Sequence, residues 1–306
     1  MNQKVRNFVL SILVVLASLN VLAWIAVFDL AKPRCLEVNF FDVGQGDAIF
    51  IETPQRHQIL IDGGPDLKIL EKLGREMPFY DKNIDLVILT HPERDHLAGL
   101  LGVLKKYKVE NVFWTGIKRD TSEYEEWQRL IKKEETKIYI VPSVQRIMMG
   151  KDISMNFLYP IENLVGKEYE NSNDTSIVAK LNFKKNSFLF TGDVSKSVEG
   201  ELAICENSRQ NSCQFASIDS DVLKIAHHGS KTSASEEFIA EVSPEIAVIS
   251  VGKNNSYGHP HPEVLDILNK FGIKVLRTDL DGDIKIISDG KNIMLRNTKK
   301  YEYTKE

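Results

Sequence analysis

The segment THPERDHLAGL, from Thr90 to Leu100, places two histidines, a glutamate and an aspartate within six positions. It follows an apolar run directly, so these side chains come at the end of an expected strand. Asp193 likewise follows the run FLFTG, and His227 and His228 follow LKIA. Because ligands collect beyond strand ends in sheet-based α/β folds, we expect these loops to meet at one point.

Imidazole and carboxylate groups together are suited to zinc, manganese or iron. His91 and Glu93 are two apart and can project together from an extended segment, whereas Asp95 and His96 begin the next helix. Two pairs therefore predict two divalent metal ions, with Asp193 bridging them. A water between two such ions becomes a hydroxide nucleophile near neutral pH, while the ions neutralise charge on a phosphoryl or carbonyl oxygen. Asp193, Asp95 and His259 are the predicted catalytic residues.

Each of these motifs alone has an ordinary structural explanation. HPERDH can be a solvated turn, Thr-Gly-Asp is common turn chemistry, and His228 can simply pack in the core. Their joint placement after apolar strands in one chain is what favours a metal site.

The surrounding pattern predicts an α/β fold. Short β-favouring runs at 36–43, 47–53 and 57–63 predict a meander of three strands. Next, the periodicity indicates a helix over 67–77, a buried strand over 84–90 and a helix over 97–107. Mixed sheets covered by helices are expected. Further strands are expected at 111–114, 137–141, 155–159, 176–183, 187–190, 222–226 and 246–251, and further helices at 122–134 and 262–271.

The first thirty residues differ from the rest of the chain. Phe8 to Phe28 contains no charged residue and is long enough to cross a bilayer, which predicts one transmembrane helix. A cleaved signal peptide is the alternative, although no Ala-x-Ala site precedes Asp29. Basic residues lie on both sides of the span, so they do not fix its orientation. We divide the chain into an N-terminal tail and anchor (1–34), a hydrolase domain (35–297) and a charged tail (298–306).

The composition of the chain argues against one class of function. The 306 residues carry a formal net charge of −4, so the chain lacks the overall basic charge of a protein that coats nucleic acid. Cys205 and Cys213 can close a small disulfide if the domain faces an oxidising compartment, with two free thiols as the alternative. Cys35 has no obvious partner.

The order of the motifs FFDVGQGDA, LIDGG, THPERDHLAG, NDTSIV, LFTGD, LKIAHHGS and NSYGHPHPEVL resembles the metallo-β-lactamase superfamily. It looks most like the extracytoplasmic hydrolase domain of ComEC-type DNA-uptake proteins, from about Asn39 to Asp283. The resemblance implies a four-layer αββα sandwich with a dinuclear metal cleft. The implied metal ligands are His91, Glu93, Asp95, His96, Asp193 and His227, with His228 as the alternative to His227.

Two departures from the family pattern matter. Glu93 stands where the superfamily usually has a third histidine and where ComEC-like members commonly have aspartate. An oxygen-rich site favours manganese, with zinc as the alternative. The sequence also lacks the many membrane spans of a DNA-uptake channel, so we expect a hydrolase domain on an anchor without transport.

Several polar residues near these motifs are candidate supporting groups. Asp62 resembles a superfamily residue beneath the metal loop and is expected to orient a ligand by a hydrogen bond, with a plain β-turn as the alternative. Asp174 is a weak ligand candidate and equally a capping residue. Gly44 and Gly46, in the loop 42–47, let the backbone approach an anion or the metal loop, or simply form a hairpin.

A second group of polar residues is expected to contact substrate. Ser230, Thr232 and Ser233 follow the double histidine and can hold phosphate oxygens, or else begin a helix. His259, in YGHPHP, can bind substrate or donate a proton to the leaving oxygen.

These patterns predict a membrane-anchored metal-dependent hydrolase that acts on phosphodiesters, most specifically a nuclease that cuts DNA outside the cytoplasm. One alternative is a β-lactamase or another ester or amide hydrolase. The other is a non-catalytic DNA-binding module of the same fold.

Overall fold

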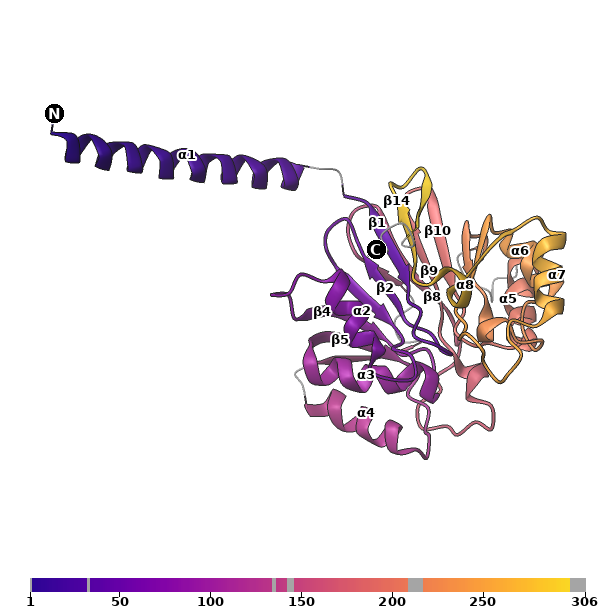
Figure 1. The fold of residues 1–306 in the computed structure, drawn as a ribbon. Coiled ribbons are helices and arrows are strands. Elements are labelled where there is room, and N and C mark those ends of the chain that lie inside the picture. The colour runs from indigo at the N-terminus through magenta and orange to yellow at the C-terminus, as the bar shows by residue number, and fades with distance from the viewer. Residues whose placement is uncertain (1, 32–33, 134–135, 142–145, 209–216, 298–306) are drawn as a thin grey trace. The chain divides into compact units, whose positions relative to one another are not determined.

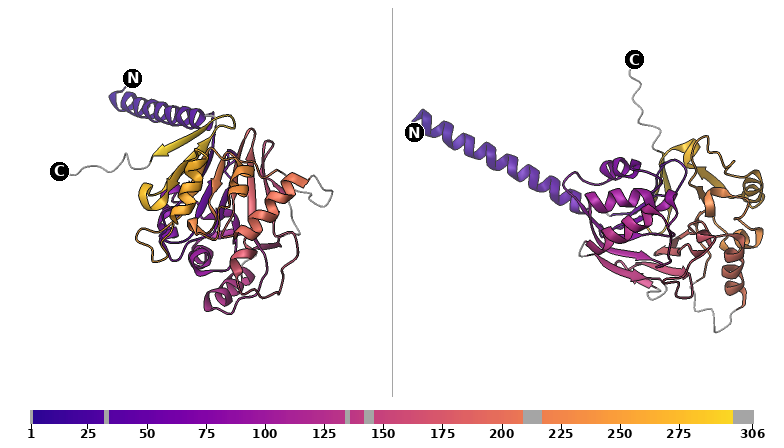
Figure 2. Two further views of the ribbon diagram at one scale, coloured as in Figure 1. Left: turned by 90° about the vertical axis from the view of Figure 1, so that its right-hand side faces the viewer. Right: turned by 90° about the horizontal axis from the view of Figure 1, so that it is seen from below.

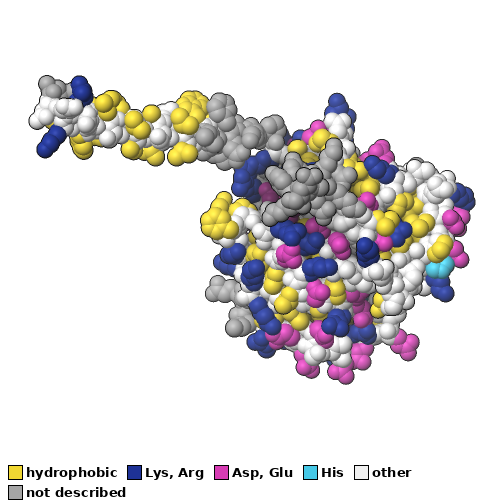
Figure 3. All heavy atoms as spheres, in the orientation of Figure 1, with side chains coloured by type: hydrophobic (Ala, Val, Ile, Leu, Met, Phe, Trp, Pro, Cys, Tyr) yellow, Lys and Arg dark blue, Asp and Glu magenta, His cyan; other side chains and the backbone are white. Residues whose placement is uncertain are grey.

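The computed structural model describes residues 2–31, 34–133, 136–141, 146–208 and 217–297, and the chain divides into two compact units, Met1–Arg34 and Cys35–Glu306. The first unit is the helix α1 (Gln3–Ala31). Within the described residues, Gln3–Trp24 is the one helix whose length and composition suit a bilayer. Its coloured side chains in Figure 3 are predominantly hydrophobic. A signal sequence near the N-terminus has the same length and composition.

The first sheet of the second unit has eight strands in the order β15-β14-β1-β2-β3-β4-β5-β6. β1, β2 and β3 pair antiparallel in sequence order, which confirms the predicted meander, and β3 to β6 pair in parallel. The strands are β1 (Leu36–Phe40), β2 (Ile49–Glu52), β3 (Gln58–Ile61), β4 (Asn83–Ile88), β5 (Lys108–Trp114), β6 (Lys137–Ile140), β14 (Ile284–Ser288) and β15 (Ile293–Asn297).

The second sheet has seven strands in the order β13-β12-β11-β10-β9-β8-β7. β10 to β13 run parallel, so their carboxyl ends meet at one edge of the sheet. The strands are β7 (Arg146–Met148), β8 (Ile153–Tyr159), β9 (Val178–Phe183), β10 (Asn186–Phe190), β11 (Val222–Lys224), β12 (Ile246–Ile249) and β13 (Lys274–Arg277).

Helices cover the outer face of each sheet, and a third apolar cluster fills the space between the sheets. α2, α3 and α4 pack their buried side chains on the first sheet, whereas α5, α6 and α7 pack on the second. Figure 1 and the right-hand view of Figure 2 show the two helical layers on opposite sides of the strands. This arrangement confirms the predicted αββα sandwich. The helices are α2 (Lys68–Glu76), α3 (Arg94–Lys106), α4 (Ser122–Lys133), α5 (Lys196–Ser208), α6 (Glu236–Val242), α7 (Pro262–Lys270) and α8 (Thr278–Asp281), with short 3-10 turns η1 (Ser172–Thr175) and η2 (Ala226–Gly229).

Some elements were not anticipated from the sequence. α6 has seven residues and α8 four, too few for a helical period to be recognised. The edge strands β7, β13 and β15 are half exposed or short, so their apolar runs are weak. The predicted Cys205–Cys213 disulfide and the tail 298–306 lie outside the residues whose side chains are described.

Candidate metal centre

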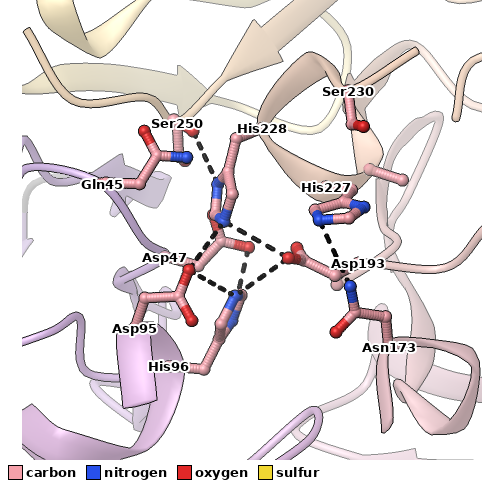
Figure 4. A network of polar contacts seen from close by, with 12 residues as sticks. Gln45, Asp47, Asp95, His96, Asn173, Asp193, His227, His228, Ser230 and Ser250 are labelled. Carbon is pink, nitrogen blue, oxygen red and sulfur yellow. Dashed lines mark hydrogen bonds and ion pairs between the residues drawn. The ribbon is translucent and has the colours of Figure 1, made fainter. Parts of the chain in front are cut away.

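The polar loops converge at the carboxyl ends of parallel strands, as the sequence pattern predicted. Asp62 follows β3, His91 follows β4 and Asp95 lies in the first turn of α3. Asp193 follows β10, and His228 lies in η2 after β11. These segments bring side chains from both sheets to one site (Figure 4).

Four metal-competent side chains meet there: Asp95, His96, Asp193 and His228, with one ligand atom from each lying within 4.8 Å of the others. Asp193 Oδ2 lies 3.3 Å from His96 Nε2 and 3.3 Å from His228 Nε2. Asp95 Oδ2 lies 3.2 Å from His228 Nε2. We call this set the four-residue cluster; Figure 4 shows its members pointing toward a common centre.

Hydrogen bonds behind the cluster fix the direction of both imidazoles. His228 Nδ1 donates to the carbonyl oxygen of Ser250 at 2.9 Å. His96 Nδ1 donates at 2.8 Å to Asp62 Oδ2, which also accepts the hydroxyl proton of Thr90. With Nδ1 occupied in each ring, the Nε2 lone pairs face the cluster, which is the arrangement that metal-binding histidines use.

The carboxylates of the cluster are ionised and therefore favour a cation beside them. Burial opposes ionisation of Asp193, but His228, His96 and Lys224 hold the pKa of its carboxyl well below the usual value. Burial likewise opposes the charged imidazole of His96, yet Asp193 and Asp95 raise its pKa well above the ordinary value. The pKa of His228 is raised in the same way. In the absence of another cation, protons on the imidazoles balance the carboxylates; a divalent ion displaces those protons.

The donor set fits a divalent metal ion. Several buried polar atoms at the site have no hydrogen-bond partner among the described residues: His91 Nε2, His96 Nε2, Asp193 Oδ1 and Asp47 Oδ1. A buried polar atom without a hydrogen bond destabilises the folded state, and a common explanation for such an atom is that it binds an ion. Two carboxylates and two imidazoles suit zinc, manganese or iron.

The adjacent residues His227 and His228 have different roles in the structure, and these roles differ from the main prediction. His227 and His228 both have left-handed backbone angles, with φ of 50° and 56°, which turn the two neighbouring rings to different sides. His228 enters the four-residue cluster. His227 instead accepts a hydrogen bond from Asn173 at 3.2 Å and lies 3.2 Å from the hydroxyl of Thr232. The structure therefore places the alternative ligand, His228, where the sequence analysis first placed His227.

His91 and Glu93 are outside the four-residue cluster. The carboxylate of Glu93 is held by Arg119 and by the Ser172 hydroxyl. His91 Nδ1 lies 3.1 Å from the Thr90 hydroxyl. Because that hydroxyl donates its own proton to Asp62, His91 Nδ1–H must donate to the hydroxyl oxygen, and Nε2 of His91 then carries a free lone pair. Burial and the neighbouring His96 lower the pKa of His91 to about 3, so this imidazole is neutral.

The remaining predicted residues lie around the cluster. Asp174 accepts the backbone N–H of Ser195 at 3.1 Å, a contact that joins η1 to the loop after β10. Ser233 donates to the carbonyl of Ala226 at 2.8 Å and is fully buried, so it braces η2. Ser230 and Thr232 are hydrogen-bonded to each other at 3.0 Å.

A pocket of about 190 Å³ opens beside the four-residue cluster. Burial and the nearby His228 lower the pKa of His259, in its wall, to about 4, so its ring is uncharged at neutral pH. The lining residues are Gln45, Glu93, Asp95, Asn173, Asp193, His227, His228, Tyr257 and His259.

Two buried charged residues at the site, Asp47 and Lys224, were not predicted from the sequence as functional groups. Lys224 is 1% exposed and forms an ion pair with Asp47, and its ammonium lies 3.6 Å from Asp193 Oδ1. Lys224 also donates to the carbonyl of Gly192 at 3.0 Å. Asp47 and Asp193 raise the pKa of Lys224 although burial opposes its charge, so it is a fixed cation at the site. A lysine inside an apolar strand run is the sequence signal that could have identified it.

The glycine loop 42–47 packs directly on the metal loop. Gly46 has a φ of 136°, and a Cβ there would lie 2.1 Å from the carbonyl oxygen of Asp95. The backbone N–H of Asp47 donates to that same carbonyl at 3.3 Å. Close approach to the metal loop is thus one reason for glycine at position 46.

Replacing Gly46 by alanine is expected to lower the free energy of unfolding by about 2–4 kcal/mol, because the positive φ and the clash with Asp95 both add cost. Gly74 is the matched control, since it lies inside α2 with nothing within 4 Å of a built Cβ. Gly74→Ala is expected to raise stability by about 0.5–1 kcal/mol. Thermal unfolding of the two variants checks this, and equal melting temperatures would contradict the packing described for Gly46.

Comparison with known proteins agrees with this architecture. The family described as "Metallo-beta-lactamase superfamily" matches residues 41–253. ComE operon protein 3 of Bacillus subtilis is 34% identical over 268 residues, covering 81% of this chain and 32% of that protein. Recombination protein 2 of Haemophilus influenzae is 29% identical over 266 residues, covering 84% of this chain and 29% of that protein. The chain thus spans about a third of the length of these curated relatives.

A solved structure shows the same fold at low sequence identity. The metallo-beta-lactamase fold protein YhfI from Bacillus subtilis superposes with a TM-score of 0.52 at 14% identity, over 79% of this chain and 96% of that one. The family match covers most of the domain, and the relatives agree with the ComEC-type resemblance of the motifs. This chain belongs to the metallo-beta-lactamase superfamily.

Proposed function

We propose that this protein is a metal-dependent phosphodiesterase that cuts DNA. The observation that carries the proposal is the four-residue cluster, Asp95, His96, Asp193 and His228, of which all but His96 line an open pocket. A divalent ion held by these residues supplies positive charge to a phosphoryl oxygen and acidifies water. The superfamily membership supports a hydrolase. A DNA substrate is supported by the similarity to a protein named for recombination.

The chain's own residues prepare the site in distinct ways. Asp62 and the Ser250 carbonyl keep the Nε2 atoms of His96 and His228 directed at the ion position. His259 is neutral and lines the pocket, so it contacts substrate as a hydrogen-bonding group. Asp95 and Asp193 hold the negative charge that attracts the cation.

A dinuclear centre is part of the proposal. Nε2 of His91 and Oδ1 of Asp193 are both buried and without a hydrogen bond among the described residues, which makes them candidate ligand atoms for a second ion. Glu93 joins that ion only if it leaves Arg119 and Ser172. The carboxylates at the site favour manganese over zinc. Metal analysis of the purified protein tests both the number and the identity of the ions.

We further propose that α1 anchors the domain outside the cytoplasm. The support is the apolar helix Gln3–Trp24, together with the resemblance of the sequence motifs to the extracytoplasmic hydrolase domain of ComEC-type proteins. Protease added to intact cells distinguishes the two sides of the membrane: cleavage of the domain supports the proposal, and full protection contradicts it.

The activity is tested with the full chain in detergent, incubated with single-stranded and double-stranded DNA and added manganese. We expect cutting that stops when EDTA is added. The His228→Gln variant, purified identically, controls for contaminating nucleases and is expected to be inactive. Hydrolysis of a chromogenic cephalosporin without DNA cutting would replace the proposal by a β-lactamase. DNA binding without cutting would instead identify a non-catalytic module.

A further inference from the structure

An exposed aromatic side chain lies at the rim of the metal pocket. Tyr257 is 69% exposed and lines the same pocket as Asp95, Asp193 and His228. An exposed tyrosine beside a pocket offers a large, rigid ring face with a polar hydroxyl, which suits contact with a ligand.

Tyr257 is the outermost of three rings that lead to the four-residue cluster. Its ring stacks on His259 with centroids 5.6 Å apart and an interplanar angle of 24°. His259 in turn meets His227 edge to face at 5.8 Å. Because His259 covers one face of the tyrosine ring and the side chain stays largely exposed, the other face is open to a flat ligand.

The loop that carries Tyr257 is held in place before any ligand arrives. Asn255 Oδ1 accepts the backbone N–H groups of Tyr257 and His259, at 3.1 and 3.0 Å. Asn255 Nδ2 donates to the carbonyls of Gly252 and His259, and Gly252 N–H donates to Gln45 in the pocket wall. A fixed aromatic face binds a ligand without a further ordering cost.

The pocket wall also limits how a substrate can be held. Among the described residues that line it, none is lysine or arginine. The nucleotides of a substrate therefore meet no lysine or arginine there, and the contacts left to them are polar groups such as His259 and the flat face of Tyr257. Stacking on aromatic rings is how proteins commonly bind unpaired bases, whereas bases in a duplex already stack on both faces.

We propose that Tyr257 is a stacking platform for an unpaired nucleobase adjacent to the phosphate that the metal centre acts on, so that the substrate is single-stranded nucleic acid. This subsite rests on the proposed phosphodiesterase function. The stacked base fixes the position of its neighbouring phosphate at the four-residue cluster.

The test compares Tyr257→Ala with wild type on two single-stranded oligonucleotides of equal length, one oligothymidylate and one with abasic sugars, using the full chain in detergent with manganese. We expect KM for oligothymidylate to rise about tenfold, the size of one lost stacking contact, with kcat nearly unchanged. Kinetics on the abasic strand should not change. Tyr257→Phe should behave as wild type because it keeps the ring. Tyr80→Ala is the matched control, since Tyr80 is 72% exposed and lies outside the pocket lining.

Three outcomes would overturn the subsite. Equal losses on both strands would show that Tyr257 only positions His259, and unchanged kinetics on both would show that no base stacks there. A wild-type protein that cuts duplex DNA but neither single strand would also overturn the subsite and leave the phosphodiesterase function standing, whereas one that cuts no DNA at all would contradict that function itself.

Discussion

His228→Gln is expected to lose the bound metal ion, whereas His227→Gln keeps it. His228 Nε2 lies 3.2 Å from Asp95 and 3.3 Å from Asp193, and its other nitrogen is held by the Ser250 carbonyl. Changes to residues that only support a metal ligand already weaken metal affinity about 10–100-fold, so loss of a ligand should cost more than about 100-fold. Metal content after dialysis and calorimetric titration with manganese measure the difference.

The matched variant makes this test specific to one ring. His227 bonds to Asn173 and Thr232, outside the four-residue cluster, so we expect at most a few-fold change in metal affinity for His227→Gln. DNA cutting should fall with metal content in His228→Gln. If His227→Gln loses metal and His228→Gln retains it, the ligand assignment from the structure is wrong and the first assignment from the sequence is correct.

The fold was predictable because its strands are short apolar runs with clear turns between them. The runs at 36–43, 47–53 and 57–63 became the meander β1 to β3. The predicted helix over 97–107 overlaps α3, which begins three residues earlier and ends one residue earlier. That shift has a physical reason, since the first turn of α3 carries the polar residues Arg94, Asp95 and His96, which hide the apolar period.

The site was predictable only in part. A residue becomes a metal ligand only if its side chain points toward the metal position, and the sequence gives the residue type but not that orientation. Two adjacent histidines are equivalent in a sequence, and the left-handed backbone at His227 and His228 decides which ring enters the cluster. Glu93 has the right chemistry, but its position against Arg119 depends on a residue 26 positions away. Lys224 was taken as part of a buried strand because its neighbours are apolar, although a buried charge needs a buried counter-charge.

Lys224→Met is expected to lower the free energy of unfolding by about 3–5 kcal/mol in the presence of EDTA, because it removes the lysine that pairs with the buried carboxylate of Asp47. Asp47 is 1% exposed and forms an ion pair with Lys224. Urea unfolding followed by fluorescence measures the change. The control is Lys270→Met, whose lysine pairs with Glu236 at an exposed site where the two side chains are 61% and 49% exposed. That change should stay within about 0.5 kcal/mol.

A double-mutant cycle separates the ion pair from simple loss of packing. Asp47→Asn added to Lys224→Met should cost much less than Asp47→Asn alone, because the first change has already removed the partner charge. Manganese should recover part of the stability of Lys224→Met, since the variant keeps all four residues of the cluster and loses a cation that competes with the metal. Additive costs for Asp47→Asn and Lys224→Met would show that the two side chains stabilise the fold independently. In that case Lys224 would not be the fixed counter-charge of this metal centre.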